Sequence, residues 1–183
     1  MEDIMGEIME GKAQDSQIGS FLTALRIRGE NDNVVSAAAS VMRKFANQIT
    51  ISNYPVLVDT CGTGGDGSNT FNISTLSAII TAGAGVAIAK HGNRSISSKC
   101  GSADILEAFG AKVDLDPSVV EKMINEIGFG FMFAPKFHPA MRHVMPTRRS
   151  LGMRTIFNVL GPLTNPAGAQ RHVLGVFDKN LTE

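Results

Sequence analysis

Residues 56–94 read VLVDTCGTGGDGSNTFNISTLSAIITAGAGVAIAKHGNR and contain one complete strand–helix–strand unit. The aliphatic run at residues 56–58 is typical of a short buried strand, and residues 86–89 predict the next strand. Between them, apolar side chains recur at helical spacing, at Ile73, Leu76, Ile79 and Ile80. Two strands joined by a helix within about 35 residues are the minimum for a right-handed parallel crossover.

The same alternation continues toward the C-terminus. Helices are expected over residues 102–109 and from Asp116-Pro117 to Gly128, with strands at 130–134 and 172–177. Residues 139–151 predict a helix kinked by Pro146. The predicted fold class is therefore α/β with a parallel sheet.

The first fifty residues have a different texture. Three amphipathic helices are expected, the second capped by Asp15 or Ser16 and stopped near Gly29, the third running from about Asp32 to Gln48. No chemical constellation lies in these helices, which favours a packing or subunit-contact role. We divide the chain into a helical module, residues 1–52, and an α/β domain, residues 53–183.

Composition narrows the functional classes. Hydrophobic residues make up 43% of the 183-residue chain, and 17 basic residues balance 17 acidic ones, so nothing favours binding to nucleic acid or to an acidic membrane. No apolar run is long enough for a membrane span, and no signal peptide is visible. Two cysteines, Cys61 and Cys100, are too few for a disulfide framework or a zinc site. These features predict a cytoplasmic protein.

Two polar loops carry the first chemical signal. Residues 59–66 form a glycine-rich loop between a strand and a helix, where backbone N–H groups can approach a phosphate, although an ordinary glycine-rich turn fits equally well. Residues 90–94, with Lys90 and Arg94, follow the neighbouring strand. Because the carboxyl ends of adjacent parallel strands share one crevice, the two loops together predict a site for a polyanionic phosphorylated ligand.

A third segment is rich in arginine. Residues 137–142 and 148–166 gather arginines and histidines without matching acids. A guanidinium group is the usual means of holding a carboxylate in a fixed plane, so a carboxylate ligand is one interpretation. A basic surface helix is the other.

Five motifs occur in a fixed order: Gly62-Thr63-Gly64-Gly65-Asp66, Asn72-Ile73-Ser74-Thr75, Lys90-His91-Gly92-Asn93-Arg94, Gly101-Ser102-Ala103-Asp104 and the run from Arg154 to Pro166. This ordered set resembles the anthranilate phosphoribosyltransferase family, over nearly the whole chain. The resemblance implies the fold shared by nucleoside phosphorylases and this class of phosphoribosyltransferase. It also implies that the amine of anthranilate attacks C1 of phosphoribosyl pyrophosphate (PRPP), with Mg²⁺ assistance, in tryptophan biosynthesis.

The resemblance also assigns residues. Lys90, His91 and Arg148 would be catalytic, and Ser74 would contact magnesium. Anthranilate would be met by Gly62, Asn93, Arg148 and Pro162, with Arg148 on its carboxylate. PRPP would be bound by Gly62, Gly65, Asp66, Thr70, Asn72, Ile73, Ser74, Thr75, Lys90, His91, Gly92, Asn93, Arg94, Ser95, Ile96, Ser97, Ser98 and Ser102.

Two departures from the family pattern bear on these expectations. Family members carry an adjacent Asp-Glu pair that holds magnesium further along a chain about twice as long, whereas the adjacent acids here are Glu2-Asp3. The α/β domain is therefore expected to be truncated, with a strand edge or an apolar face left open. A homodimer through the helical module is expected. The alternatives are an inactive fragment, a non-catalytic paralogue that binds nucleic acid, and a pyrimidine nucleoside phosphorylase.

Overall fold

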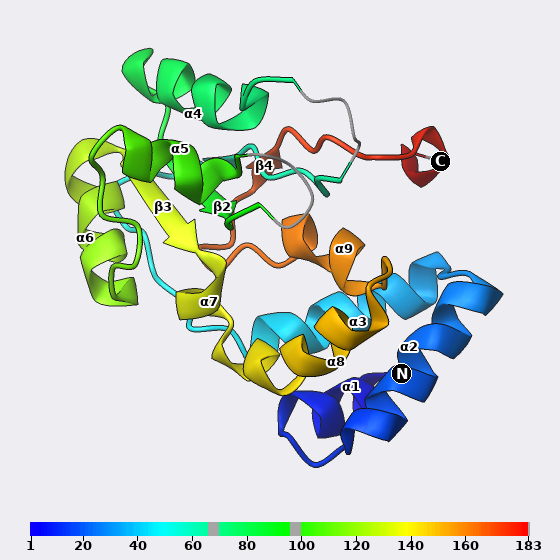
Figure 1. Ribbon diagram of the computed structural model, residues 1–183. Coiled ribbons are helices and arrows are strands. Elements are labelled where there is room, and N and C mark those ends of the chain that lie inside the picture. The colour runs from blue at the N-terminus through cyan, green and yellow to red at the C-terminus, as the bar shows by residue number, and fades with distance from the viewer. Residues whose placement is uncertain (66–69, 96–99, 183) are drawn as a thin grey trace.

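A parallel β-sheet forms the centre of the fold (Figure 1). The computed structural model describes residues 1–65, 70–95 and 100–182, and within these residues four parallel strands pair in the order β3-β2-β1-β4. The strands are β1 (Val58–Asp59), β2 (Ile88–Gly92), β3 (Phe129–Phe133) and β4 (Arg171–His172). The predicted α/β class with a parallel sheet is confirmed.

Helices cover both faces of the sheet. Helix α4 (Ile73–Gly83) connects β1 to β2, and α5 (Ser102–Ala108) and α6 (Pro117–Ile127) lie between β2 and β3. Successive side chains of a strand point to opposite faces. Accordingly, Phe131 packs with α5, whereas Met132 packs with α6. The same alternation separates neighbouring side chains of β2, which matters for the site.

The strand boundaries differ from the predicted ones. Strand β1 lacks residues 56 and 57 because the N–H of Leu57 donates to the Gln170 side chain, at 2.8 Å. Strand β2 begins two residues later than predicted, since Val86 is held by the last turn of α4, and it continues to Gly92 because Lys90, His91 and Gly92 pair with β3. The prediction that residues 90–92 form a loop is therefore wrong.

Strand β4 is also shorter than predicted. It ends at His172. The next residues lie alongside the glycine-rich loop, because the N–H of Thr63 donates to the Gly175 carbonyl at 2.9 Å. Strand β3 runs from Phe129 rather than from Gly130 and ends one residue earlier than expected.

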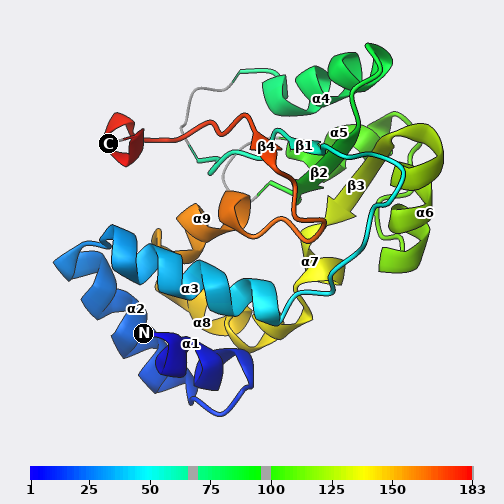
Figure 2. The ribbon, with the colours of Figure 1, turned by 180° about the vertical axis from the view of Figure 1, so that it is seen from behind.

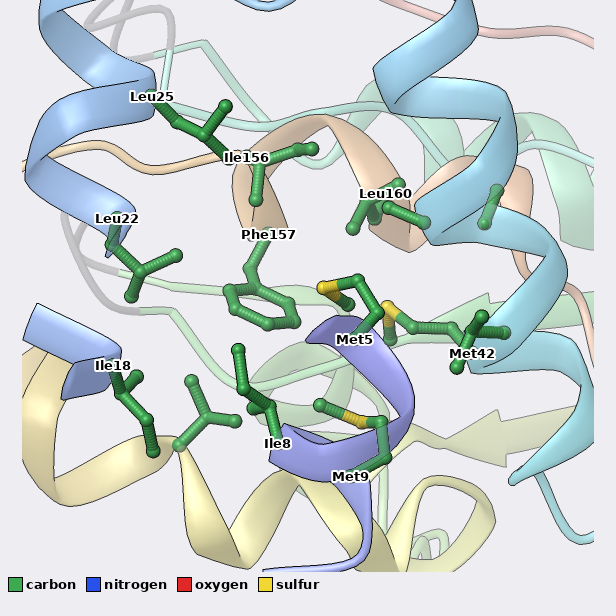
Figure 3. Packing of buried hydrophobic residues seen from close by; sticks show 14 residues of the cluster. Met5, Ile8, Met9, Ile18, Leu22, Leu25, Met42, Ile156, Phe157 and Leu160 are labelled. Atoms are coloured by element: carbon green, nitrogen blue, oxygen red, sulfur yellow. The ribbon is translucent and has the colours of Figure 1, made fainter. Parts of the chain in front are cut away.

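The N-terminal helices form a separate layer with two helices from the last third of the chain (Figures 1 and 2). Helices α1 (Glu2–Met9), α2 (Asp15–Arg28) and α3 (Asp32–Lys44) pack with α8 (Met145–Leu151) and α9 (Phe157–Leu160). Figure 3 shows apolar side chains from α1, α2, α3 and α9 meeting in one core. Residues beyond 52 thus complete the helical core, and the boundary at residue 52 stays a prediction.

Two helix ends differ from the sequence-based expectation. The second helix is not capped by Asp15 or Ser16: the N–H of Gln14 donates to the Gln17 side chain, while the Asp15 carboxylate accepts from Thr147 at 2.8 Å. The third helix ends at Lys44 rather than Gln48, whose side chain donates to the carbonyl of Arg43.

The segment between β3 and β4 is made of short helical turns. They are α7 (Ala134–Phe137), η1 (Pro139–His143), α8, α9 and η2 (Gly161–Leu163); η3 (Lys179–Thr182) follows β4. The single kinked helix predicted for residues 139–151 is wrong. Pro146 lies in the first turn of α8, where a missing N–H leaves no hydrogen bond unmade, so it starts a helix instead of bending one.

One apolar face is uncovered, as expected. On and beside α4, Phe71 and Ile80 are 68% and 63% exposed, and Val173 just after β4 is 70% exposed. No strand among the described residues pairs with the outer edge of β4. None of the helices in the described residues is both long and apolar enough to cross a membrane.

Candidate active site

The glycine-rich loop leaves β1 at the carboxyl end of the sheet. Gly64 and Gly65 have φ values of 64° and 70°, the left-handed region that favours glycine. Gly62 is required for a different reason: a Cβ there would lie 2.7 Å from the Gly175 carbonyl oxygen. Asp66, a predicted ligand of PRPP, lies outside the described residues.

Asp59, the last residue of β1, organises the base of this loop. Its fully buried carboxylate accepts from the N–H of Cys61 at 3.0 Å, from the N–H of His91 at 3.2 Å and from Asn165 Nδ2 at 2.7 Å. Burial raises the pKa of Asp59, and the hydrogen bond from Asn165 opposes that rise. One carboxylate therefore ties the start of the glycine-rich loop to β2.

Lys90 is a buried cation between the two strands. Its side chain is 1% exposed, and its Nζ donates to Thr60 Oγ1 at 3.2 Å, while Thr60 in turn donates to the carbonyl of Ser74 in α4. Burial lowers the pKa of Lys90, and the nearby charge of Asp59 opposes that effect. No ion pair within 4 Å joins Lys90 to a carboxylate of the described residues. Lys90 is therefore not a solvent-exposed surface residue.

His91 follows Lys90 in β2 and points to the opposite face of the sheet. Its Nδ1 lies 3.1 Å from the Gly161 carbonyl oxygen, which can only accept, so Nδ1 carries the proton. The ring centre lies 5.0 Å from that of His138, and both Nε2 atoms are buried with no hydrogen-bond partner in the part of the chain that the structure describes. Burial lowers the pKa of His91 to about 4 and of His138 to about 3. Both imidazoles are therefore neutral at pH 7.

The start of α4 faces the glycine-rich loop. Thr75 is buried in the first turn of the helix, and its Oγ1 has no hydrogen-bond partner among the described residues. Ser74 beside it is half-buried, and Asn72 donates to the carbonyl of Cys100 at 3.2 Å. Thr70 and Ile73 are exposed. The helix N-terminus and an unpartnered hydroxyl together suit an anion.

The second predicted loop begins directly after β2. The carbonyl of Asn93 accepts from Ser102 Oγ at 3.1 Å. Arg94 does not point to the glycine-rich loop: its guanidinium binds Glu107 and Asp104 on α5. Ile96, Ser97 and Ser98 lie outside the described residues. The structure thus brings Asn93, Ser95 and Ser102 together but engages Arg94 elsewhere.

Arg148 lies in α8, in the arginine-rich segment. Its guanidinium carbon is 5.4 Å from the centre of the Phe157 ring, and burial lowers its pKa. No carboxylate of the described residues forms an ion pair with it. Phe157 begins α9, which leads directly to Gly161 and to the buried Pro162. Pro162 is next to Gly161, whose carbonyl oxygen lies 3.1 Å from His91 Nδ1.

Three residues of the site were missed in the sequence. Asp59 and Asn165 hold the strand ends together, the latter also donating to the Ala89 carbonyl at 2.9 Å. Arg154 contacts the Gly65 carbonyl and stacks 4.0 Å from the centre of the Phe177 ring. Asp59 directly after a strand was the one available signal; the partners of the other two come from distant segments.

The structure also limits where a metal could bind. No group of three or more His, Cys, Asp or Glu side chains within residues 1–65, 70–95 and 100–182 is placed to hold a metal ion. Burial raises the pKa of the Cys61 thiol to about 12, so it is protonated at neutral pH. Ser74 offers one hydroxyl oxygen at the start of α4.

Comparison with known proteins places this arrangement in a family. Residues 1–46 match the helical bundle domain of a glycosyl transferase family, and residues 54–183 match the α/β domain of the same family. The chain belongs to this glycosyl transferase family.

Individual members of this family are similar to the chain over all or nearly all of its length. The anthranilate phosphoribosyltransferase of Persephonella marina is 55% identical in sequence to this chain. The match covers the whole of this chain and 54% of the length of that enzyme. Its fold matches the crystal structure of the Thermus thermophilus anthranilate phosphoribosyltransferase with a TM-score of 0.93 and 49% identity, over 98% of this chain and 54% of that one. The chain thus spans about half the length of the relatives that it matches.

Two structures of the Saccharomyces cerevisiae anthranilate phosphoribosyltransferase contain ligands. One, in complex with PRPP and Mg, matches with a TM-score of 0.86 and 34% identity, over 97% of this chain and 52% of that one. The other, in complex with 4-fluoroanthranilate, matches with a TM-score of 0.84 and 34% identity, over 98% and 52%.

Proposed function

We propose that this chain forms the PRPP-binding part of an enzyme that transfers the phosphoribosyl group of PRPP to the amine of anthranilate. The carrying observation is Lys90, a buried cation without an ion-pair partner among the described residues, set below a glycine-rich loop and the start of a helix. The names of the relatives favour this reaction over nucleoside phosphorolysis and over a non-catalytic role.

The two faces of β2 would bind different substrates. On the face of Lys90, the glycine-rich loop, Thr75 and the start of α4 would hold the pyrophosphate of PRPP. On the face of His91, Arg148 would bind the carboxylate of anthranilate and Pro162 would line its route. The carboxyl end of β2, at Gly92 and Asn93, would bring the ribose and the amine together.

The reaction places its main demand on the leaving group. A bond forms between the anthranilate nitrogen and C1 of the ribose, the bond from C1 to the pyrophosphate oxygen breaks, and the amine loses one proton. An aromatic amine is already neutral at pH 7, so the nucleophile needs little help from a base. Stabilising the charge on pyrophosphate is then the larger task, which preorganised N–H groups and the Lys90 ammonium suit.

Magnesium fits this site only in part. Mg²⁺ commonly binds through one or two carboxylates together with substrate phosphates and water. Among the described residues Ser74 offers a single hydroxyl, so the ion would enter with the pyrophosphate and take its carboxylate ligands from outside these residues. When bound, it would neutralise charge on the leaving group. A cytoplasmic homodimer that contacts its partner through the helical module belongs to the same proposal.

Arg148→Ala tests the assignment of the acceptor face. Calorimetric titration of the purified chain with anthranilate, in the absence of PRPP so that no reaction occurs, should show affinity lowered about tenfold or more, because a guanidinium–carboxylate pair is lost. The affinity for PRPP should change less than about twofold, because Arg148 lies away from Lys90. Arg149→Ala, the exposed neighbour on α8, is the matched control and should bind both ligands normally. Equal losses for both ligands would contradict the division between the two faces.

A further inference from the structure

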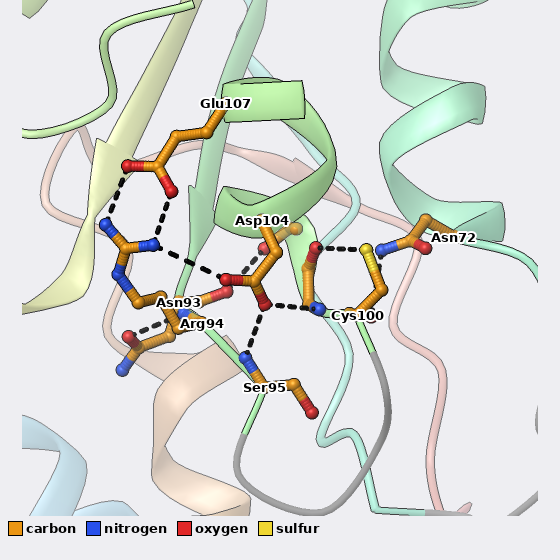
Figure 4. A network of polar contacts seen from close by, with 9 residues as sticks. Asn72, Asn93, Arg94, Ser95, Cys100, Asp104 and Glu107 are labelled. Carbon is orange, nitrogen blue, oxygen red and sulfur yellow. Dashed lines mark hydrogen bonds and ion pairs between the residues drawn. The ribbon is translucent and has the colours of Figure 1, made fainter. Parts of the chain in front are cut away.

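The loop between β2 and α5 is closed at its base by a single carboxylate oxygen. Asp104 Oδ2 accepts from the N–H of Gly101 at 2.7 Å and from the N–H of Ser95 at 3.0 Å (Figure 4). These two amides are six residues apart in the sequence. One side chain therefore fixes the distance between the two ends of the loop.

The ends of the loop are also in direct contact. A Cβ on Gly101 would lie 2.7 Å from the carbonyl carbon of Arg94, a clash with backbone that no side-chain movement relieves. Gly101 has an extended backbone, so the absence of a side chain, and not an unusual φ, is what the position requires. We call this closed base of the loop, formed by Asp104, Gly101 and the backbone of Arg94 and Ser95, the neck.

Arg94 strengthens the neck from the outside. Its guanidinium binds both carboxylate oxygens of Glu107, lies 3.4 Å from Asp104 Oδ1 and stacks 5.5 Å from the centre of the Phe133 ring. Figure 4 shows Arg94 turned toward α5, where these two acids lie. Its charge is therefore used within the protein.

The neck is joined to the other half of the site. Asn72, at the start of α4, donates to the carbonyl of Cys100 next to Gly101. Ser102 donates to the carbonyl of Asn93 at the exit of β2. The position of Asp104 is thereby linked to both loops that face the carboxyl end of the sheet.

An ordinary helix cap accounts for only part of this geometry. An acid at the third position of a helix commonly accepts from the N–H of the residue that precedes the helix, which here is Gly101. The bond to Ser95 is additional, because it reaches back across the whole loop. The two N–H groups lower the pKa of Asp104, so the carboxylate is ionised at neutral pH and both bonds are charge-assisted.

We infer that Asp104 is a positioning residue that sets Asn93, Ser95 and Ser102 in register for the phosphate groups of PRPP. Arg94, in the same arrangement, is engaged by Glu107 and Asp104 and does not contact the ligand. The inference rests on the proposed function, and it adds a role for α5 in presenting the loop.

Variants at two positions of α5 distinguish the hydrogen bonds of Asp104 from the ion pair between Arg94 and Glu107. Asp104→Ala should lower the affinity for PRPP with Mg²⁺ about tenfold in calorimetric titration, because two charge-assisted hydrogen bonds are lost. Asp104→Asn keeps one acceptor oxygen and should lower the affinity less; it also serves if the alanine variant does not fold. Glu107→Gln is the matched control, since it weakens the Arg94 pair and leaves the neck intact, and it should change the affinity less than about twofold.

A second readout does not depend on the ligand. Amide hydrogen exchange of Ser95 and Gly101 should become several-fold faster in Asp104→Asn, without ligand, and should stay at the wild-type rate in Glu107→Gln. Unchanged exchange in Asp104→Asn would overturn the inference, as would wild-type affinity for PRPP in that variant. A wild-type chain that fails to bind PRPP would instead refute the proposed function, and the exchange rates would still decide the role of Asp104.

Discussion

The helical layer and the carboxyl edge of the sheet are held together by opposite means. The core of the helical layer is built mainly on a cluster of aliphatic, methionine and phenylalanine side chains. The edge of the sheet buries four polar residues, Asp59, Lys90, His91 and His138. Asp59 accepts three hydrogen bonds, whereas the Nε2 atoms of both histidines have no hydrogen-bond partner among the described residues. The first region gains stability from area removed from water, whereas the second gives up stability for chemical groups that a ligand can use.

The largest effect on stability is expected from a cavity in the helical core. Leu22→Ala, at a fully buried position in α2, should lower the free energy of unfolding by about 2 to 5 kcal/mol, because the lost transfer energy adds to the energy of the cavity. Urea unfolding measures the change. Ile27→Ala on the same helix, at a side chain that is 82% exposed, is the control and should change stability by less than about 0.5 kcal/mol. Similar losses for both variants would mean that the helical layer does not fold as described.

Acid should weaken the edge of the sheet more than the helical core. The folded-state pKa values of His91 and His138, about 4 and about 3, lie below the ordinary value of 6.5, so the unfolded chain takes up protons first. Stability is therefore present at neutral pH and falls as the pH drops from about 6.5 toward 4 and 3. For His91 the loss is on the order of 3 kcal/mol, since one pKa unit corresponds to about 1.4 kcal/mol.

His138→Gln sharpens this measurement. The raised pKa of Asp59 acts in the opposite direction, so the histidine contribution is read from the difference between two pH profiles of urea unfolding. The wild-type profile should fall more steeply with acid than that of the variant. Parallel profiles would show that His138 is not buried in a neutral form.

The smallest change in stability is expected at the residue proposed to matter most for the ligand. Lys90→Met replaces a buried ammonium that has one hydrogen bond, so the free energy of unfolding should change by less than about 1 kcal/mol. The affinity for inorganic pyrophosphate should fall by about tenfold or more, as a buried cation is lost. Lys112→Met, at an exposed position, is the control for removing a charge. Strong destabilisation by Lys90→Met would assign Lys90 a structural role instead.

The sequence predicts local elements better than it predicts the buried polar edge of the sheet. The strand–helix–strand unit and the helix from Pro117 to Gly128 are local patterns, and both are present. Lys90 and His91 were placed in a loop because polar residues rarely lie in a strand buried on both faces. Only the pairing of β2 with β3 extends the strand through them.

Contacts between distant segments could not be predicted. Asn165 reaches Asp59 across more than a hundred residues, and no local periodicity indicates such a bond. Arg94 was expected to face the phosphates because of its position after a strand, but two acids one turn apart on α5 engage it. The resemblance predicts which residues face the ligand. The residues that support them are found only in the tertiary structure.

The composition of the helical layer has a consequence for folding during synthesis. Its first three helices end at Lys44, yet Phe157 and Leu160 in α9 complete their core. A ribosome adding about 5 to 20 residues per second needs between about 6 and about 23 seconds to reach Leu160 after Lys44. During that interval the apolar faces of α1, α2 and α3 lack the side chains of α9, so the growing chain exposes apolar surface that the folded protein buries.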